Sequence, residues 1–175
     1  SYNMLKLTAL LAQAAPETGR YADYYERTLY NHILASQHPQ GGFVYFTPMR
    51  PQHYRVYSQV HEGMWCCVGS GIESHARHGE FIYSHDGDTL HVKLFIASTL
   101  DWREQGVRIT QRTRFPDEAR TQLTVDGAGS FALRLRYPGW VAPGALTVKL
   151  NGQRVPVRAA PGGEVELRRT WRAGD

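Results

Sequence analysis

The hydrophobic pattern changes its period near residue 80, and this change constrains the fold more than any other feature of the sequence. In residues 1–80, apolar side chains recur every three or four positions, as on amphipathic helices. In residues 81–175, they alternate with polar side chains, as on strands with one buried face. We therefore predict an α+β multidomain chain, with a helical part at 1–80 and an incomplete all-β sandwich at 81–175.

Three helices are expected in the first part. One covers residues 3–15, with Met4, Leu7 and Leu11 on one face, which Leu5 and Leu10 widen. The second covers about 21–36 and carries a stripe at a spacing of four that is typical of core packing: Tyr21, Tyr25, Leu29 and Ile33. The third follows the cysteines at about 68–78. Residues 38–59 are rich in Pro, Gly and aromatics and are expected to form a long loop, a kind of segment that is often functional.

The second part is expected to hold several short strands separated by turns, as in a β-sandwich. The Asn151-Gly152 pair indicates a tight hairpin, because both residues accept the positive φ of a type I′ turn. The strands are expected at 90–97, 107–113, 122–126, 131–137, 146–150, 154–157 and 164–169.

Charge and hydropathy argue against two classes of partner. The formal net charge of +4 lies wholly in residues 81–175, because residues 1–80 hold six basic and six acidic side chains. The arginines there are scattered along predicted strands, which is typical of solvated strand faces and does not indicate a nucleic-acid site. No apolar run is long enough to span a bilayer, so we expect no membrane partner.

Two adjacent cysteines, Cys66 and Cys67, are the only ones in the chain. Neighbouring Cα atoms lie closer than a disulfide normally allows, so a bridge between them would be strained and no other is available. Two free thiols suit a reducing compartment or a metal site, although a free cysteine is often simply a small buried side chain. Gly69 and Gly71 flank Ser70 near the expected start of the third helix, where the helix dipole stabilises a thiolate.

Other side chains near the pair are possible zinc ligands. Zinc normally takes four ligands, and the cysteines supply two. His61, His75 and His78 are candidates for the rest, but each is better explained as an ordinary surface or core histidine. Glu73 could be a ligand, a partner of a ligand or an ordinary polar residue. Ser70 is not a nucleophile elbow, because Val68 stands where that motif requires glycine.

Several blocks, in order along most of the chain, resemble glycoside hydrolase family 127, the β-L-arabinofuranosidases. The longest are residues 1–8 (SYNMLKLT), 21–27 (YADYYER), 29–37 (LYNHILASQ) and 65–71 (WCCVGSG). Shorter ones follow at 79–83, 94–98 and 133–140.

This resemblance implies a fold and a chemistry. Residues 1–80 would be the C-terminal part of an (α/α)6 catalytic barrel, including the Cys-Cys loop, and residues 81–175 the sandwich that follows it. The family releases terminal β-L-arabinofuranosyl units with retention, using a zinc-bound cysteine as nucleophile and a Glu as general acid/base. Cys66 matches the nucleophile and a zinc ligand, and Cys67 matches a second zinc ligand. The expected cofactor is Zn2+, and the expected partner is an arabinofuranose-containing glycan.

The resemblance also implies missing parts. The family's other zinc ligands, a Glu and a Cys, precede the segment that matches Tyr2–Leu5, and its acid/base lies further upstream. Neither Glu62 nor Glu73 matches that acid/base. We therefore expect the chain to be a C-terminal fragment whose partner is the missing N-terminal part of the same protein, and to be inactive and bind zinc weakly alone.

Two other functions remain open, and so does the compartment. The β-rich part would serve as a carbohydrate-binding or structural module without catalysis if aromatics such as Trp102, Trp140 and Trp171 stack on sugars. A redox role for the cysteines is disfavoured, because they lack the C-x-x-C spacing. Reducing cytoplasm suits thiolate chemistry, whereas metal-held thiols also survive in a bacterial periplasm or outside the cell.

Overall fold

The computed structural model describes residues 1–16 and 19–175. These residues form two compact units. The first comprises residues 1–16 and 21–80, and the second comprises residues 81–175 with the short segment before Tyr21.

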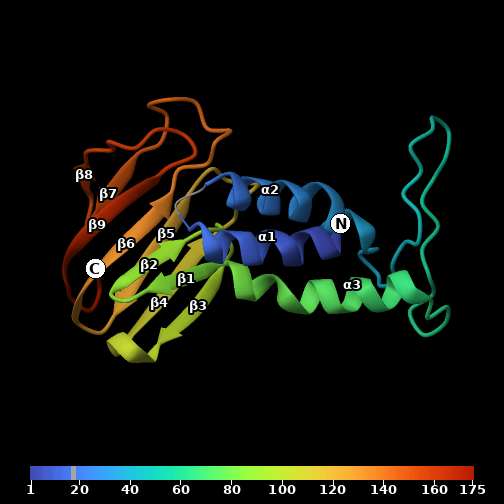
Figure 1. The fold of residues 1–175 in the computed structure, drawn as a ribbon, viewed down its shortest axis with the longest axis horizontal. Coiled ribbons are helices and arrows are strands. Elements are labelled where there is room, and N and C mark those ends of the chain that lie inside the picture. Colours follow the sequence, from blue (N-terminus) through green and yellow to red (C-terminus); the bar gives the residue numbers. More distant parts are fainter. Residues whose placement is uncertain (17–18) are drawn as a thin grey trace. The chain divides into compact units, whose positions relative to one another are not determined.

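The first unit is helical. Its helices are α1 (Tyr2–Ala14), α2 (Arg20–Thr28) and α3 (Cys66–Arg77), which run beside one another in Figure 1. After α2 the chain stays helical through a π-turn, η1 (Leu29–Ile33), and a 3₁₀ turn, η2 (Leu34–Ser36). The predicted stripe of the second helix is confirmed as core, since Tyr25, Leu29 and Ile33 are all buried.

The apolar face predicted for the first helix is not its buried face here. Leu5, Thr8 and Ala12 are buried, whereas Leu10 is 62% exposed and Met4, Leu7 and Leu11 are also exposed. Because α1 is apolar around much of its circumference, more than one stripe of side chains could pack, and the periodicity alone does not predict which stripe is buried. At its start, the Tyr2 hydroxyl donates a 2.6 Å hydrogen bond to Glu73 on α3.

The segment between η2 and α3 is a long loop, as predicted. It forms only isolated bridges between Gln37 and Phe43 and between Val44 and Tyr57. Ser58 closes it, because its N–H donates to the Phe43 carbonyl at 2.9 Å and its hydroxyl accepts from the Phe43 N–H at 3.1 Å. Figure 1 shows this segment, in cyan to green, leading into the start of α3.

The second unit consists of two main sheets and a hairpin. The first sheet has the order β1-β2-β6-β9 and the second the order β3-β4-β5, while β7 pairs with β8. All pairings are antiparallel except that of β2 with β6. The strands are β1 (Tyr83–Asp86), β2 (Thr89–Val92), β3 (Ser98–Trp102), β4 (Val107–Thr113), β5 (Thr121–Asp126), β6 (Gly129–Arg136), β7 (Val148–Leu150), β8 (Gln153–Val155) and β9 (Glu164–Trp171). A short 3₁₀ turn, η3 (His78–Phe81), leads into them, and another, η4 (Arg103–Gln105), joins β3 to β4.

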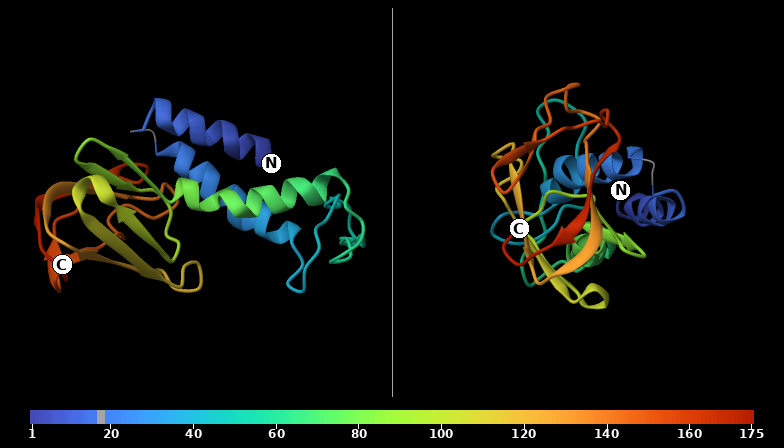
Figure 2. Two further views of the ribbon diagram at one scale, coloured as in Figure 1. Left: turned by 90° about the horizontal axis from the view of Figure 1, so that it is seen from below. Right: turned by 90° about the vertical axis from the view of Figure 1, so that its left-hand side faces the viewer.

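The core of the second unit draws side chains from both main sheets, which makes it a sandwich (Figure 2). Phe131 of β6 is fully buried and stacks on Trp171 of β9, and Trp102 of β3 meets its edge. The Trp171 indole N–H donates to the Phe131 carbonyl at 3.0 Å. The prediction that Trp102 and Trp171 stack on sugars is therefore wrong, because both are core residues. Trp140, the third tryptophan of that prediction, is 53% exposed.

Three details of the β part differ from prediction. The strand expected at 90–97 ends at Val92, and β1 and β3 are additional strands. The expected alternation also fails there, because His91 and Lys93 are as buried as their apolar neighbours. His91 Nδ1 lies 3.0 Å from the Glu164 carboxylate, a pairing that offsets the cost of burying both groups. Arg136, expected on a solvated face, is buried.

The fold is thus mixed α and β, as predicted from the change of period. The assignment of residues 1–80 to the end of an (α/α)6 barrel stays a prediction. Across the described residues, no helix combines the length and the apolar character that crossing a membrane requires.

Candidate functional site

Cys66 and Cys67 occupy the first turn of α3. The helix begins at Cys66, two residues earlier than predicted, with Trp65 as its extended N-cap. The N–H groups of Val68 and Gly69 bond to the Trp65 carbonyl, whereas those of Cys66 and Cys67 precede these first intrahelical bonds. Unsatisfied N–H groups and the positive end of the helix dipole favour negative charge at this point.

The two thiols are free and close together. Cys66 is exposed and Cys67 is half-buried. Their sulfur atoms lie 3.8 Å apart, well beyond a disulfide bond. Two thiolates on one tetrahedral zinc, each about 2.3 Å from the metal, have their sulfurs about 3.8 Å apart. The pair therefore fits two of the four positions around zinc without any rearrangement.

Tyr45 of the long loop lies against the cysteines. A hydrogen bond with Cys66, together with the charge of both thiols, raises the pKa of the Tyr45 hydroxyl. Burial and a hydrogen bond with Cys66 raise the pKa of the Cys67 thiol. The raised value favours the neutral form of Cys67, so a bound cation is needed to ionise it at neutral pH.

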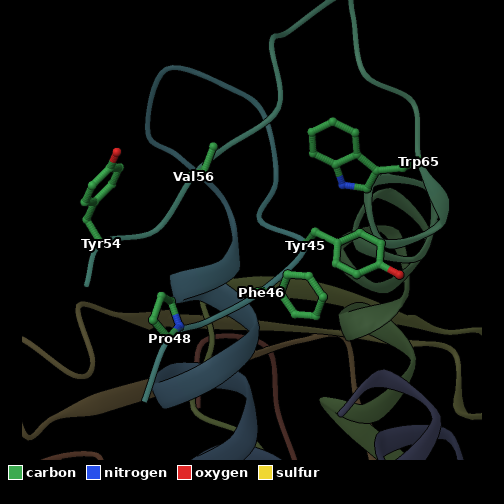
Figure 3. Close-up of a pocket in the computed structure, with 6 residues that line it drawn as sticks. All are labelled: Tyr45, Phe46, Pro48, Tyr54, Val56 and Trp65. Carbon is green, nitrogen blue, oxygen red and sulfur yellow. The ribbon is translucent and has the colours of Figure 1, made fainter. Parts of the chain in front are cut away.

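An apolar hollow of about 580 Å³ has in its lining Trp65, which directly precedes Cys66, and Tyr45, but neither cysteine; we call it the aromatic hollow. Figure 3 shows its lining, in which Trp65 stands at the start of α3 and Tyr45 turns its hydroxyl toward that helix. The ring centres of these two residues lie 6.5 Å apart. The remaining lining residues belong to the loop: Phe46, Pro48, Tyr54 and Val56.

The other predicted ligand candidates do not gather around the cysteines. Glu73 accepts a hydrogen bond from Tyr2, His75 bonds through Nδ1 to the Gly71 carbonyl, and His78 lies 3.5 Å from the Tyr25 hydroxyl. His61 is exposed in the loop. Within the described part of the chain, no three His, Cys, Asp or Glu side chains are grouped so that they could hold a metal ion.

The loop was predicted from the sequence, but Tyr45 and Trp65, which lie next to Cys66 in the structure, were not singled out. Tyr45 and Trp65 lie twenty residues apart, so no local pattern links them. Phe43 marks the contact that brings Tyr45 to α3, because the site of a Cβ on Gly71 lies 2.5 Å from its ring. Gly71 is a local sign of such close packing, whereas a Cβ on Gly69 would meet nothing within 4 Å.

Two family models match most of the chain. The model of the GH127 β-L-arabinofuranosidase catalytic domain matches residues 1–80, and that of the GH127 middle domain matches residues 89–175. The chain belongs to glycoside hydrolase family 127. A comparison with curated proteins gave no match.

Solved structures agree with this family 127 membership. One is a GH127 β-L-arabinofuranosidase from Geobacillus stearothermophilus T6, which is 26% identical, with a TM-score of 0.78 over 99% of this chain and 29% of that one. A structure described as a glycoside hydrolase is 23% identical, with a TM-score of 0.80 over 97% of this chain and 30% of that one. A GH127 β-arabinofuranosidase is 22% identical, with a TM-score of 0.76 over 97% of this chain and 29% of that one. The family 127 chain thus spans less than a third of these relatives.

Proposed function

We propose that this chain supplies the nucleophile and part of the zinc site of a retaining glycoside hydrolase that releases terminal β-L-arabinofuranosyl units. The observation that carries the proposal is the pair of thiols at the start of α3, with sulfurs 3.8 Å apart. Membership of family 127 supports the reaction class. The Geobacillus relative, described as a β-L-arabinofuranosidase, supports the substrate.

Cys66 and Cys67 are the residues that would hold zinc. Zinc bound there would keep both sulfurs ionised at neutral pH. The raised pKa of Cys67 shows that the protein alone does not favour this ionised state. The free N–H groups of the first turn of α3 add a smaller stabilisation of negative charge.

Cys66 is the proposed nucleophile, because it is the more exposed of the two thiols. Its sulfur attacks the anomeric carbon, and a C–S bond forms as the glycosidic C–O bond breaks. The departing oxygen takes a proton from a general acid. Water then attacks the same carbon, gives its proton to that group, and the sulfur leaves. Two inversions at one carbon give net retention.

The aromatic hollow would receive the substrate next to this sulfur. Its lining is apolar except for the hydroxyls of Tyr45 and Tyr54 and the Trp65 indole N–H. Aromatic faces contact the C–H faces of sugar rings and exclude water from the reacting carbon. Tyr45, through its hydrogen bond with Cys66, would also fix the direction in which the sulfur points.

Further parts of the site would come from outside these residues. The described residues offer two clustered ligands, whereas zinc takes four. The exposed leucines of α1 likewise offer an apolar face that more protein would cover. We therefore propose that the general acid/base and the remaining ligands lie in preceding sequence, and that this chain alone is inactive.

The decisive experiment compares variants of a version extended upstream to the full length of the family. Cys66→Ser is expected to abolish hydrolysis of 4-nitrophenyl β-L-arabinofuranoside, with a loss of about a thousandfold or more. Cys67→Ser is expected to reduce the zinc content measured by atomic absorption and the activity together. Glu62→Gln, which changes an exposed carboxylate four residues from Cys66, serves as the control and should stay within about twofold. Activity retained by Cys66→Ser would remove this residue from the nucleophile role.

One observation favours a second function, carbohydrate binding by the β unit. Trp140 is 53% exposed, and its ring stacks on Phe115 with centres 5.9 Å apart and an angle of 21° between planes. Such a platform suits a sugar ring. Slower migration of the 175-residue chain in gels containing arabinan, abolished by Trp140→Ala, would support this function; unchanged migration would contradict it.

A further inference from the structure

The turn between β7 and β8 places an asparagine before a glycine at an exposed corner of the second unit. Asn151 and Gly152 are both exposed and form the turn, with φ values of 50° and 83°. The two strands pair up to Leu150 and Gln153, so the turn residues lie outside the ladder. The chain has three asparagines, and Asn151 is the one that glycine follows.

An asparagine in this setting is open to attack by the backbone nitrogen of the next residue. Gly152 has no side chain to shield that nitrogen, and a Cβ built on it would meet nothing within 4 Å. The ladder hydrogen bonds resume only at Gln153, so the Gly152 nitrogen is not held by a strand partner. Asn3 and Asn31 lie instead in the helical segments α1 and η1, before residues with large side chains that hinder the same attack.

The side chain of Asn151 holds a neighbouring carboxylate in place. Its Nδ2 donates a hydrogen bond to Asp175 Oδ1 at 2.8 Å. The Asp175 side chain is only 9% exposed, and its second oxygen accepts from the Arg172 N–H at 2.9 Å. The hydrogen bond from Asn151 is the main cause that lowers the pKa of Asp175 below its usual value. The carboxylate is therefore ionised at neutral pH and depends on Asn151 as a donor.

Asp175 belongs to a turn that follows β9, formed by residues 172–175, which we call the terminal turn. The Asp175 N–H donates to the Arg172 carbonyl at 3.1 Å. The terminal turn is bonded to β5, because the Gly174 N–H donates to the Val125 carbonyl at 2.8 Å and the Val125 N–H donates to the Asp175 carbonyl at 2.9 Å. Val125 is 1% exposed and belongs to the core. One exposed amide is thus linked, through one carboxylate, to the backbone of a core strand.

We propose that Asn151 is a site of spontaneous deamidation, and that the modification loosens the terminal turn. Asparagine is among the thermolabile residues. The Gly152 nitrogen forms a bond to the Asn151 Cγ, the side-chain amide leaves as ammonia, and a succinimide ring results. Water then adds to either ring carbonyl and opens the ring, which gives aspartate or its isomer with the chain running through the side chain. No redox change is involved.

The product removes the donor on which Asp175 depends. A carboxylate stands where Nδ2 donated, so a hydrogen bond is replaced by repulsion between like charges. Arg169, whose guanidinium lies 3.6 Å from Asp175, remains as a partner but is farther away than Asn151. The modification is independent of the proposed Cys66 chemistry, because every residue involved belongs to the second unit.

Ageing of the folded 175-residue chain tests the modification. After incubation at mildly alkaline pH, trypsin cuts behind Lys149 and Arg154 and releases the turn in a peptide with one asparagine. Relative to an unaged sample, this peptide is expected to gain aspartate and isoaspartate forms in mass spectrometry after chromatography, while Asn3 and Asn31 stay unchanged. No conversion of Asn151, or equal conversion of all three, overturns the proposal. Conversion confined to chain unfolded in urea does so too, because the folded turn would then protect the residue.

The variant Asn151→Asp, which has the charge of the product, tests the consequence. It is expected to lower the Tm by about 2–4 °C, the loss of one hydrogen bond in a chain of this size. Gln153→Glu is the matched control, because it makes the same change of amide to carboxylate on an exposed residue of the same hairpin and should leave the Tm unchanged. In an Asp175→Ala background, Asn151→Asp should have little effect. An equal loss in both backgrounds would contradict the link through Asp175.

Discussion

Cys66 and Cys67 differ in exposure although they are adjacent, and this difference is measurable without any substrate. Cys66 is exposed at the first position of α3, whereas Cys67 is half-buried. Iodoacetamide at neutral pH is therefore expected to alkylate Cys66 first, as read by mass spectrometry of the peptide that contains both. In Cys66→Ser, the remaining thiol should react slowly. Faster alkylation of Cys67 would contradict the geometry on which the nucleophile assignment depends.

His91 and Glu164 form a buried pair, with Nδ1 3.0 Å from the carboxylate and side chains 5% and 17% exposed. Removing one partner leaves the other without compensation in the interior. Glu164→Ala is therefore expected to lower the free energy of unfolding by about 2 kcal/mol in urea denaturation, less than an entirely buried pair would lose.

The same strand provides the control for that substitution. Glu166, two residues further along β9, pairs with Arg134 at 2.8 Å, but both side chains are about 40% exposed. Glu166→Ala should cost no more than about 1 kcal/mol, because solvent screens exposed pairs. Equal losses for the two variants would mean that burial does not set the contribution of the His91 pair.

At the scale of the element, two glycines of α3 have opposite surroundings. A Cβ on Gly69 would meet nothing within 4 Å, whereas a Cβ on Gly71 would lie 2.5 Å from the Phe43 ring. Gly69→Ala is expected to stabilise the helix by about 0.5–1 kcal/mol, through better helix propensity. Gly71→Ala should destabilise by about 1–3 kcal/mol, because it overpacks this contact. Thermal unfolding followed by circular dichroism compares the two.

The Gly71 variant also tests how the loop reaches the cysteines. Phe43 is two residues from Tyr45, so displacing its ring should move Tyr45 away from Cys66. Tyr45 fluorescence and Cys66 alkylation should therefore change in Gly71→Ala and not in Gly69→Ala. A Gly71→Ala chain that keeps both properties would show that Phe43 does not position the loop.

Elements whose cause is local were predicted, and those whose cause is distant were not. The Asn151-Gly152 turn forms as expected, with φ values of 50° and 83°, because two residues determine it. Strands β1 and β3, four and five residues long, are too short to display a clear period and exist through pairing with β2 and β4. The start of helix α3 was predicted two residues too late, because its N-cap residue, Trp65, makes no side-chain cap hydrogen bond that the sequence could indicate.

The candidate site was also predictable from the sequence only in part. The cysteine pair was visible in the sequence, because its two residues are adjacent and are the only cysteines of the chain, although the pair taken alone is a weak signal. The aromatic hollow was not, because Tyr45 reaches Cys66 only after Ser58 closes the loop on Phe43. The burial of Trp102 and Trp171 was not predicted either, because the sequence does not indicate whether a tryptophan at the end of a strand lies in the core or on the surface.

At the scale of the whole molecule, the number of ligands decides what the chain can do alone. Two clustered thiols fix zinc less tightly than four ligands, because each missing protein ligand is replaced by water that gains nothing from preorganisation. Titration with zinc in the presence of a chromophoric chelator is expected to give an affinity at least about a thousandfold weaker than that of an upstream-extended version. Cys66→Ser and Cys67→Ser should each weaken it further.

The same count predicts the outcome of an activity assay. A retaining glycosidase needs a proton donor for the leaving oxygen as well as a nucleophile, and no described carboxylate lies with the cysteines in a group of three or more. The 175-residue chain is therefore expected to leave 4-nitrophenyl β-L-arabinofuranoside unhydrolysed even with excess zinc, while the extended version releases nitrophenol. Because a nucleophile without its acid still reacts with an activated leaving group, the chain should trap at most one sugar on Cys66, visible as a single added glycosyl mass. Repeated turnover by the chain alone would show that a proton donor lies within it.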